Sequence, residues 1–127
     1  GYAISKLGLS ILSFGVFGFC VGSSMGVGIS SGVITDNVVP DIFFALSQGA
    51  GMAFGLGGMF IWIGLSSRNE YNKNLSLAVV VASAVVFITP FISSFAPENA
   101  RLINSITGVC FFIITIASIN VGRLLTK

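Results

Sequence analysis

The residues of this sequence that could do chemistry are few, and most are uncharged polar side chains within long apolar stretches. Four of them lie in three different stretches: Gln48, Thr89, Asn104 and Thr107. Carboxamides and hydroxyls both donate and accept hydrogen bonds, so these side chains can hold a polar ligand or join one helix to another. None of the four stands beside a base that would activate it for covalent catalysis.

The sequence contains no histidine and only two cysteines, Cys20 and Cys110. The lack of histidine excludes histidine-ligated haem, copper or zinc within this chain, and no GxxxxGK phosphate-binding loop occurs. Both cysteines lie in uncharged stretches, so we interpret them as small packing residues. A redox pair is the alternative, and it requires adjacent helices with the two sulfur atoms in register. We expect no metal site and no stand-alone enzyme.

The elements that must position these residues follow from the spacing of the charges. Charged residues are 8% of the 127 residues, whereas a soluble domain carries about 25%. They leave four uncharged runs of at least 21 residues, and about 20 residues suffice to span a bilayer. The sequence therefore predicts an all-α membrane protein with one domain, a bundle of four transmembrane helices with spans near 7–29, 42–66, 75–96 and 101–122.

The distribution of Lys and Arg predicts the orientation of this bundle. With four spans, five of the six basic residues fall on the side of the termini: Lys6, Arg68, Lys73, Arg123 and Lys127. Only Arg101 falls on the other side. The positive-inside rule then places both termini in the cytoplasm, or in the matrix or stroma of an organelle. We expect an integral multi-pass protein of a bacterial inner membrane or of an organelle inner or thylakoid membrane, and the net charge of +2 gives no indication of nucleic-acid binding.

Glycines recur at helical spacing in the first two spans. Gly18, Gly22 and Gly26 are four residues apart, with Gly15 beside them. A second set follows in the next span: Gly51, Gly55 and Gly58. Small residues let two membrane helices approach closely, so we predict that these two stripes face each other. The alternative is that one stripe faces a partner subunit.

Two positions predict irregularities in the helices. The first uncharged run is too long for one perpendicular helix, so we expect the helix to end between Gly26 and Gly32, or else to be longer and tilted. Pro90 lies inside the third span and should kink that helix, because it removes a backbone hydrogen bond. The hydroxyl of Thr89 could satisfy the freed carbonyl.

The four polar side chains share a depth in the predicted membrane. At a rise of about 1.5 Å per residue, each lies within about 10 Å of the non-cytoplasmic end of its span. Hydrogen bonds between helices are one interpretation. The functional interpretation is a shallow polar pocket open to that side, suited to a lipid headgroup, a quinone or a pigment. No intrinsic cofactor is expected.

The layout of the chain is similar to that of a known family. A glycine-rich second span, SQGAGMAFGLGGMFIWIGLSS, follows an extracytoplasmic stretch, and the cytoplasmic turns are short and basic. Four short spans in this layout resemble the DoxX-like small four-helix membrane proteins and related families of unassigned function. The resemblance implies a four-helix membrane fold and assigns no functional residue.

Taken from the sequence, the leading hypothesis is a non-catalytic accessory or structural subunit of a larger membrane complex, respiratory, photosynthetic or secretory. It would pack through its glycine-rich helix faces against lipids and other integral membrane subunits. The alternative is a small membrane carrier or pore with its polar cluster near the outer side.

Overall fold

The computed structural model describes residues 2–126, which form four long helices and one short 3₁₀ helix. In chain order these are α1 (Tyr2–Ser30), α2 (Val39–Ser66), α3 (Lys73–Phe95), η1 (Pro97–Asn99) and α4 (Ala100–Leu125). No strand occurs in the described range. All four long helices are apolar and long enough to cross a membrane, so the prediction of an all-α chain with four helices able to span a membrane is confirmed. Lys127 lies outside the described residues.

Local sequence explains where the helices begin and end. The side chain of Asn72 caps α3, because its Oδ1 accepts hydrogen bonds from the backbone N–H groups of Asn74 and Leu75 at 3.0 and 3.2 Å. Pro40 and Asp41 lie in the first turn of α2, where proline and an acidic side chain are favoured. The first helix ends at Ser30, and Gly32 follows with a left-handed φ of 76° that glycine adopts without strain.

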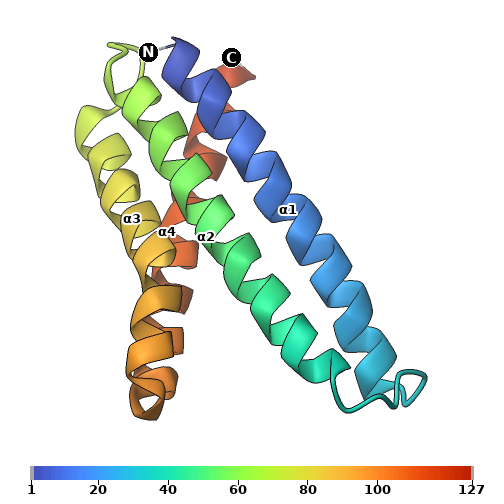
Figure 1. Cartoon of the computed structure of the whole chain (residues 1–127). Helices are drawn as coiled ribbons and strands as arrows, with labels where there is room; N and C mark the ends of the chain where they lie inside the picture. Colours follow the sequence, from blue (N-terminus) through green and yellow to red (C-terminus); the bar gives the residue numbers. More distant parts are fainter. Residues whose placement is uncertain (1, 127) are drawn as a thin grey trace.

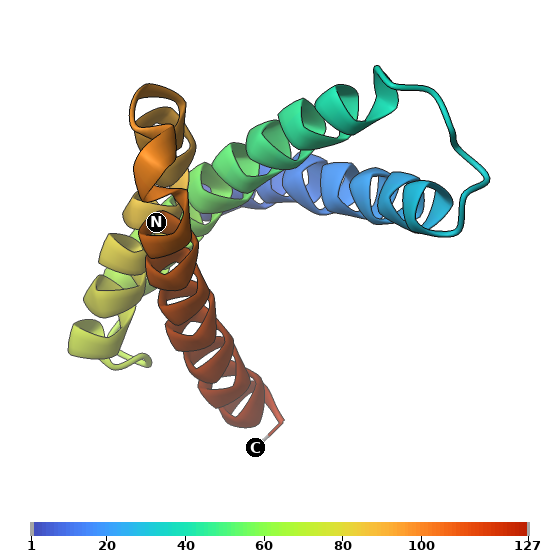
Figure 2. The same ribbon diagram turned by 90° about the horizontal axis from the view of Figure 1, so that it is seen from below.

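The four helices form an open arrangement of two arms. Figure 1 shows α1 beside α2, and α3 beside α4, with the two pairs diverging away from the end that holds both termini and the 67–72 connection. In residues 2–126, α1 approaches only α2, and α4 approaches only α3 and η1, to within 8 Å between Cα atoms. Seen from below in Figure 2, the α1–α2 arm points away from the other two helices. The fold is therefore more open than a closed four-helix bundle.

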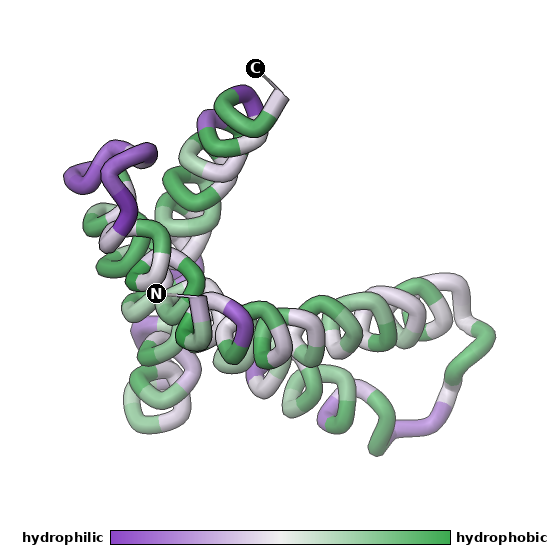
Figure 3. Tube along the Cα trace, turned by 90° about the horizontal axis from the view of Figure 1, so that it is seen from above, coloured by the Kyte–Doolittle hydropathy of each residue, from purple (hydrophilic) through white to green (hydrophobic). Residues whose placement is uncertain are grey.

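The buried core lies at the junction of the arms, between α2, α3 and α4. It consists of seven residues: Trp62, Val79, Ala82, Val86, Cys110, Ile114 and Ala117. Apart from this core, most large apolar side chains are exposed, as expected for helices that meet lipid. Figure 3 shows the hydrophilic segments gathered in the connections and near the helix ends, with hydrophobic colours along the helices.

The close contact between α1 and α2 depends on glycine. Four glycines of α1 are buried: Gly8, Gly15, Gly18 and Gly22. A methyl group added at Gly15 would lie 2.6 Å from the backbone nitrogen of Phe54, and one added at Gly57 would lie 2.5 Å from the backbone nitrogen of Leu12. Ordinary contacts begin near 3.4 Å, so neither position has room for a side chain.

The glycines of the second predicted stripe do not face α1. Gly55 and Gly58 pack on α3, where added methyl groups would lie 2.6 Å from the backbone nitrogen of Phe87 and 3.1 Å from Ser83 Oγ. The expectation that the two glycine stripes face each other is therefore wrong for α2. Successive residues of a helix point about 100° apart, and the α2 positions that meet α1 are each one residue earlier: Ala50, Phe54 and Gly57.

Two further glycines differ from the packing role predicted for them. An added methyl at Gly51 would meet nothing within 4 Å, because Gly51 lines an open cavity instead of a helix contact. Gly26 is only half-buried, and an added methyl there would reach the ring of Phe43 at 3.4 Å, which is ordinary contact. The tight part of the α1–α2 contact thus lies nearer the N-terminus than the sequence spacing indicates.

Pro90 lies within α3, as predicted, and the carbonyl it leaves free is satisfied. Pro90 has no N–H to donate to Val86, four residues earlier. Thr89 Oγ1 donates to that Val86 carbonyl at 3.1 Å. Figure 1 shows the axis of α3 changing direction along its length.

Candidate functional site

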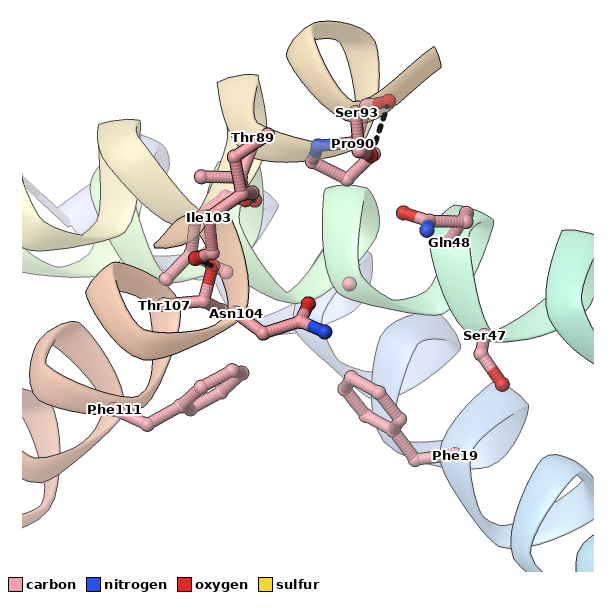
Figure 4. A pocket seen from close by; sticks show the side chains of 12 residues that line it. Phe19, Ser47, Gln48, Thr89, Pro90, Ser93, Ile103, Asn104, Thr107 and Phe111 are labelled. Carbon is pink, nitrogen blue, oxygen red and sulfur yellow. Dashed lines mark hydrogen bonds between the residues drawn. The ribbon is translucent and has the colours of Figure 1, made fainter. Parts of the chain in front are cut away.

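A cavity of about 130 Å³ lies where the two arms separate, and all four helices contribute to its lining. Figure 4 shows the polar side chains around it, which come from three of these helices, with the carboxamides of Gln48 and Asn104 directed toward each other. The polar side chains are Ser47 and Gln48 from α2, Thr89 and Ser93 from α3, and Asn104 and Thr107 from α4. The six residues lie close together because η1 turns the chain from the end of α3 directly into the start of α4. The N-terminal half of α2 borders the same cavity.

The four side chains singled out in the sequence all line this one cavity: Gln48, Thr89, Asn104 and Thr107. They come from three helices and are up to 59 residues apart in the chain, from Gln48 to Thr107. Their common depth places them at one level, and the rotation of each helix turns them toward the cavity. The structure thus establishes their proximity.

The hydroxyl groups of the cavity are already used as donors. Ser47 Oγ donates to the Phe43 carbonyl at 2.9 Å, and Thr107 Oγ1 donates to the Ile103 carbonyl at 2.9 Å. Thr89 bonds in the same way to its own helix, and so does Ser93, whose bond to the Pro90 carbonyl is drawn in Figure 4. Each hydroxyl therefore keeps only its acceptor lone pairs for a ligand.

The carboxamides of Gln48 and Asn104 are the unpartnered groups. Neither makes a hydrogen bond to any other group in residues 2–126. Figure 4 shows them on opposite sides of the cavity with their amide ends turned toward it. Gln48 is half-buried and Asn104 is exposed in the structure, so both carboxamides are accessible to a molecule that enters between the arms. These two side chains accordingly supply N–H donors and carbonyl acceptors that a bound molecule would satisfy.

Aromatic rings close the cavity on the side of the termini. Phe19 and Phe111 line it, and Phe54 joins them, with ring centroids 6.0 Å from Phe19 and 5.3 Å from Phe111. Beyond Phe54 lies a separate apolar groove of about 360 Å³ between α1, α2 and α4. Its lining includes Leu12, Trp62 and Ile114. The three rings therefore separate a polar cavity from an apolar groove.

The electrostatics of the cavity are simple, because no ionisable side chain lines it. Arg101 lies one turn before Asn104, on the exposed surface of α4. Among residues 2–126 no cluster of three or more metal-ligating side chains was found. The chemistry that the cavity offers is hydrogen bonding to an uncharged group, beside aromatic faces.

The two cysteines are apart in the fold. Cys110 is buried in the core, while Cys20 is exposed on α1. No Cα atom of α1 lies within 8 Å of α4, and a disulfide needs Cα atoms about 4.4–6.8 Å apart. The alternative of an intramolecular redox pair is therefore wrong for this arrangement.

A row of small residues on α4 was not predicted from the sequence as a contact face. Gly108, Thr115, Ser118 and Gly122 are separated by seven, three and four residues, which places them along one side of the helix. All four are exposed. The heptad spacing is visible in the sequence, but only the structure shows that no helix within residues 2–126 covers these positions. We call this row the α4 seam.

Comparison with known proteins does not identify a relative. No protein-family model matches the chain, and no curated protein and no solved structure matches it.

Proposed function

We propose that the protein is a non-catalytic accessory subunit of a larger membrane complex, and that the α4 seam receives a transmembrane helix of another subunit. This proposal rests on the observation that no other helix within residues 2–126 packs against the α4 seam. Added methyl groups at Gly108 and Gly122 would meet nothing within 4 Å, whereas the glycines of the α1–α2 contact leave no such room. Gly49 and Gly51 of α2 also have open space around them, but the four small residues of the α4 seam form a row along one side of one helix.

Physical chemistry favours a protein helix over lipid at this face. Lipid chains gain nothing from small residues, but a neighbouring helix gains close backbone packing and hydrogen bonds. The hydroxyls of Thr115 and Ser118 donate to carbonyls of their own helix at 2.8 Å, which leaves lone pairs for a donor on the partner. Spacings of three and four are those of left-handed packing, with an expected crossing angle of about +20°.

The apolar groove continues the same surface. Ser118 belongs both to the seam and to the lining of the groove, whose other walls include Leu12 and Trp62. A helix resting on the seam would therefore also cover the space between α4 and the α1–α2 arm. The proposed partner is an apolar transmembrane helix with its own small residues at the contact.

The orientation and location belong to this proposal as well. Of the basic residues within 2–126, Arg101 lies near η1, and the others lie toward the end of the termini: Lys6, Arg68, Lys73 and Arg123. By the positive-inside rule that end faces the cytoplasm, the matrix or the stroma. A bacterial inner membrane or an organelle inner or thylakoid membrane is the expected location.

The carrier or pore hypothesis has less support. A path through this single chain would have to pass the rings of Phe54 and Phe111, whose centroids are 5.3 Å apart. On the far side of these rings the groove is mainly apolar, which offers little to a hydrated solute.

Photo-crosslinking tests the seam directly. A photoreactive amino acid at Thr115 is expected to join the chain to a transmembrane peptide of another subunit in native membranes, and the same group at Leu77, an exposed position on α3, is expected to give less of that product. Gly108→Leu with Gly122→Leu should abolish the product at Thr115. Gly49→Leu is the matched control, because Gly49 is also an exposed glycine with open space around it. Crosslinks to lipid alone, or to a second copy alone, would overturn the proposal.

A further inference from the structure

The cavity between the arms has donors that nothing in the chain satisfies. The carboxamides of Gln48 and Asn104 reach it from α2 and α4, and Figure 4 shows them facing each other across it. The surrounding hydroxyls already donate to their own helices. The N–H groups of the two carboxamides are the free donors among these polar side chains, and an occupant that satisfies both presents two acceptors, one toward each carboxamide.

Charge restricts the occupant to a neutral molecule. The cavity has no ionisable side chain in its lining, so an anion or a cation would lose its hydration without a counter-charge. Phosphate headgroups are excluded from the cavity by this argument, although they can lie outside it near Arg101. A neutral group with two carbonyl oxygens meets no such penalty.

Size and shape indicate a single ring. The cavity volume is about 130 Å³, and a protein cavity of about 150 Å³ is known to hold one benzene molecule. The rings of Phe19 and Phe111 form part of its wall, and aromatic faces favour stacked or edge-on contact with another flat ring. A hydrocarbon tail on that ring could leave between the diverging arms into the bilayer.

We propose that this cavity binds the head of a para-quinone that carries a lipid tail. The two carbonyl oxygens of such a ring lie on opposite edges, which matches donors on opposite walls. The carboxamide of Gln48 donates to one oxygen and that of Asn104 to the other, with Phe19 and Phe111 against the ring. A carboxamide also carries an acceptor oxygen, so the same two side chains can turn to accept from the hydroxyls of the reduced ring. The proposal concerns binding and involves no electron or proton transfer.

Direct binding to the purified chain tests this proposal independently of any partner subunit. The probe is a 1,4-benzoquinone with a ten-carbon tail, added to the chain in lipid nanodiscs and measured by equilibrium binding of the radiolabelled compound. We expect saturable binding of one quinone per chain. Gln48→Leu and Asn104→Leu should each weaken binding about tenfold, the effect of one hydrogen bond of about 1.4 kcal/mol. Asn120→Leu is the matched control, because Asn120 is a carboxamide on α4 that does not line the cavity.

Two comparison compounds separate hydrogen bonding from apolar partition. Decylbenzene has the same tail and a ring without carbonyl groups, and it should not compete with the labelled quinone. A ring with a single carbonyl should compete about tenfold more weakly than the quinone. The proposal fails if the wild-type chain shows no saturable binding, if both leucine variants bind as tightly as the wild type, or if decylbenzene competes equally well. Far-UV circular dichroism of each variant confirms that the helices are intact.

This proposal and the proposed function fail separately. If the chain binds the quinone but crosslinks to no other subunit, the ligand site is supported and the role as an accessory subunit is refuted. If the chain crosslinks through Thr115 but binds no quinone, the role as an accessory subunit is supported and the quinone site is refuted.

Discussion

The close approach of α1 and α2 makes Gly57→Ala the most informative single substitution for the fold. An added methyl at Gly57 would lie 2.5 Å from the backbone nitrogen of Leu12 and 2.7 Å from the carbonyl oxygen of Gly8. Both neighbours are backbone atoms, so no side-chain rotation relieves the clash. To restore an ordinary contact of 3.4 Å, α1 must move away by the difference, 3.4 − 2.5 = 0.9 Å.

The expected cost follows from that displacement. Overpacking a tight contact typically destabilises a protein by about 1–3 kcal/mol, while alanine stabilises a helix by up to about 1 kcal/mol relative to glycine. Gly51→Ala isolates the second effect, because a methyl there meets nothing within 4 Å. Gly57→Ala should therefore be about 1–3 kcal/mol less stable than Gly51→Ala.

The assay follows the separation of α1 from α2 in mixed micelles. Trp62 is the only tryptophan, and Cys20 is exposed on α1, so a dye on Cys20 in a Cys110→Ala background accepts energy from Trp62. Titration with denaturing detergent then gives the free energy at which the transfer is lost. Equal stability of the Gly57→Ala and Gly51→Ala variants would refute the argument that backbone contact at Gly57 holds these helices together.

Three other predictions concern the core, a helix cap and the cysteines. Ser83 is buried and its Oγ has no hydrogen-bond partner in residues 2–126. Ser83→Ala should therefore leave the free energy of unfolding unchanged or raise it by up to about 1 kcal/mol. A decrease in the free energy of unfolding by more than about 1 kcal/mol would mean that Ser83 makes a hydrogen bond that the structure does not show. Asn72→Ala removes the cap of α3 and should lower the same free energy by about 1 kcal/mol, whereas a neutral result would mean that the cap is dispensable. Oxidation of the isolated chain should form no Cys20–Cys110 disulfide, as mass spectrometry of the non-reduced chain would show; a bridged monomer would contradict the open arrangement.

Properties that depend on position along a helix could be predicted from the sequence. The lengths of the uncharged runs predict four spanning helices, because about 20 residues must cover a bilayer of fixed thickness. The common depth of Gln48, Thr89, Asn104 and Thr107 follows from a constant rise per residue, and the structure places all four on one cavity. The hydroxyl of Thr89 bonds to the carbonyl that Pro90 frees, because both effects are local to one turn.

Properties that depend on rotation about a helix axis could not be predicted in the same way. A glycine stripe indicates that a close contact exists but not which helix makes it, so the sequence spacing predicts a contact of Gly55 and Gly58 with α1 although they meet α3. The same spacing predicts a helix contact at Gly51, which instead lines a cavity. Gly51 is only one residue, or about 100°, from Ala50, which meets α1.

The open arrangement of the arms is also a tertiary property. Hydropathy makes α1 and α4 equally suited to closing a bundle, and nothing in their composition predicts that they stay apart. The junction is instead held by long-range contacts, such as those of Phe54 with Phe19 and Phe111. The exposed α4 seam is a consequence of this arrangement, and so is the cavity with its two unpartnered carboxamides.

Native mass spectrometry of the chain extracted from its own membrane in mild detergent tests the central claim most directly. If the protein is an accessory subunit held through the α4 seam, the wild-type chain should appear in a complex with at least one other integral membrane protein. The Gly108→Leu, Gly122→Leu variant should appear mainly as free chain, while Gly49→Leu should remain in the complex. A wild-type chain found only as a monomer or only as a homo-oligomer would contradict the account.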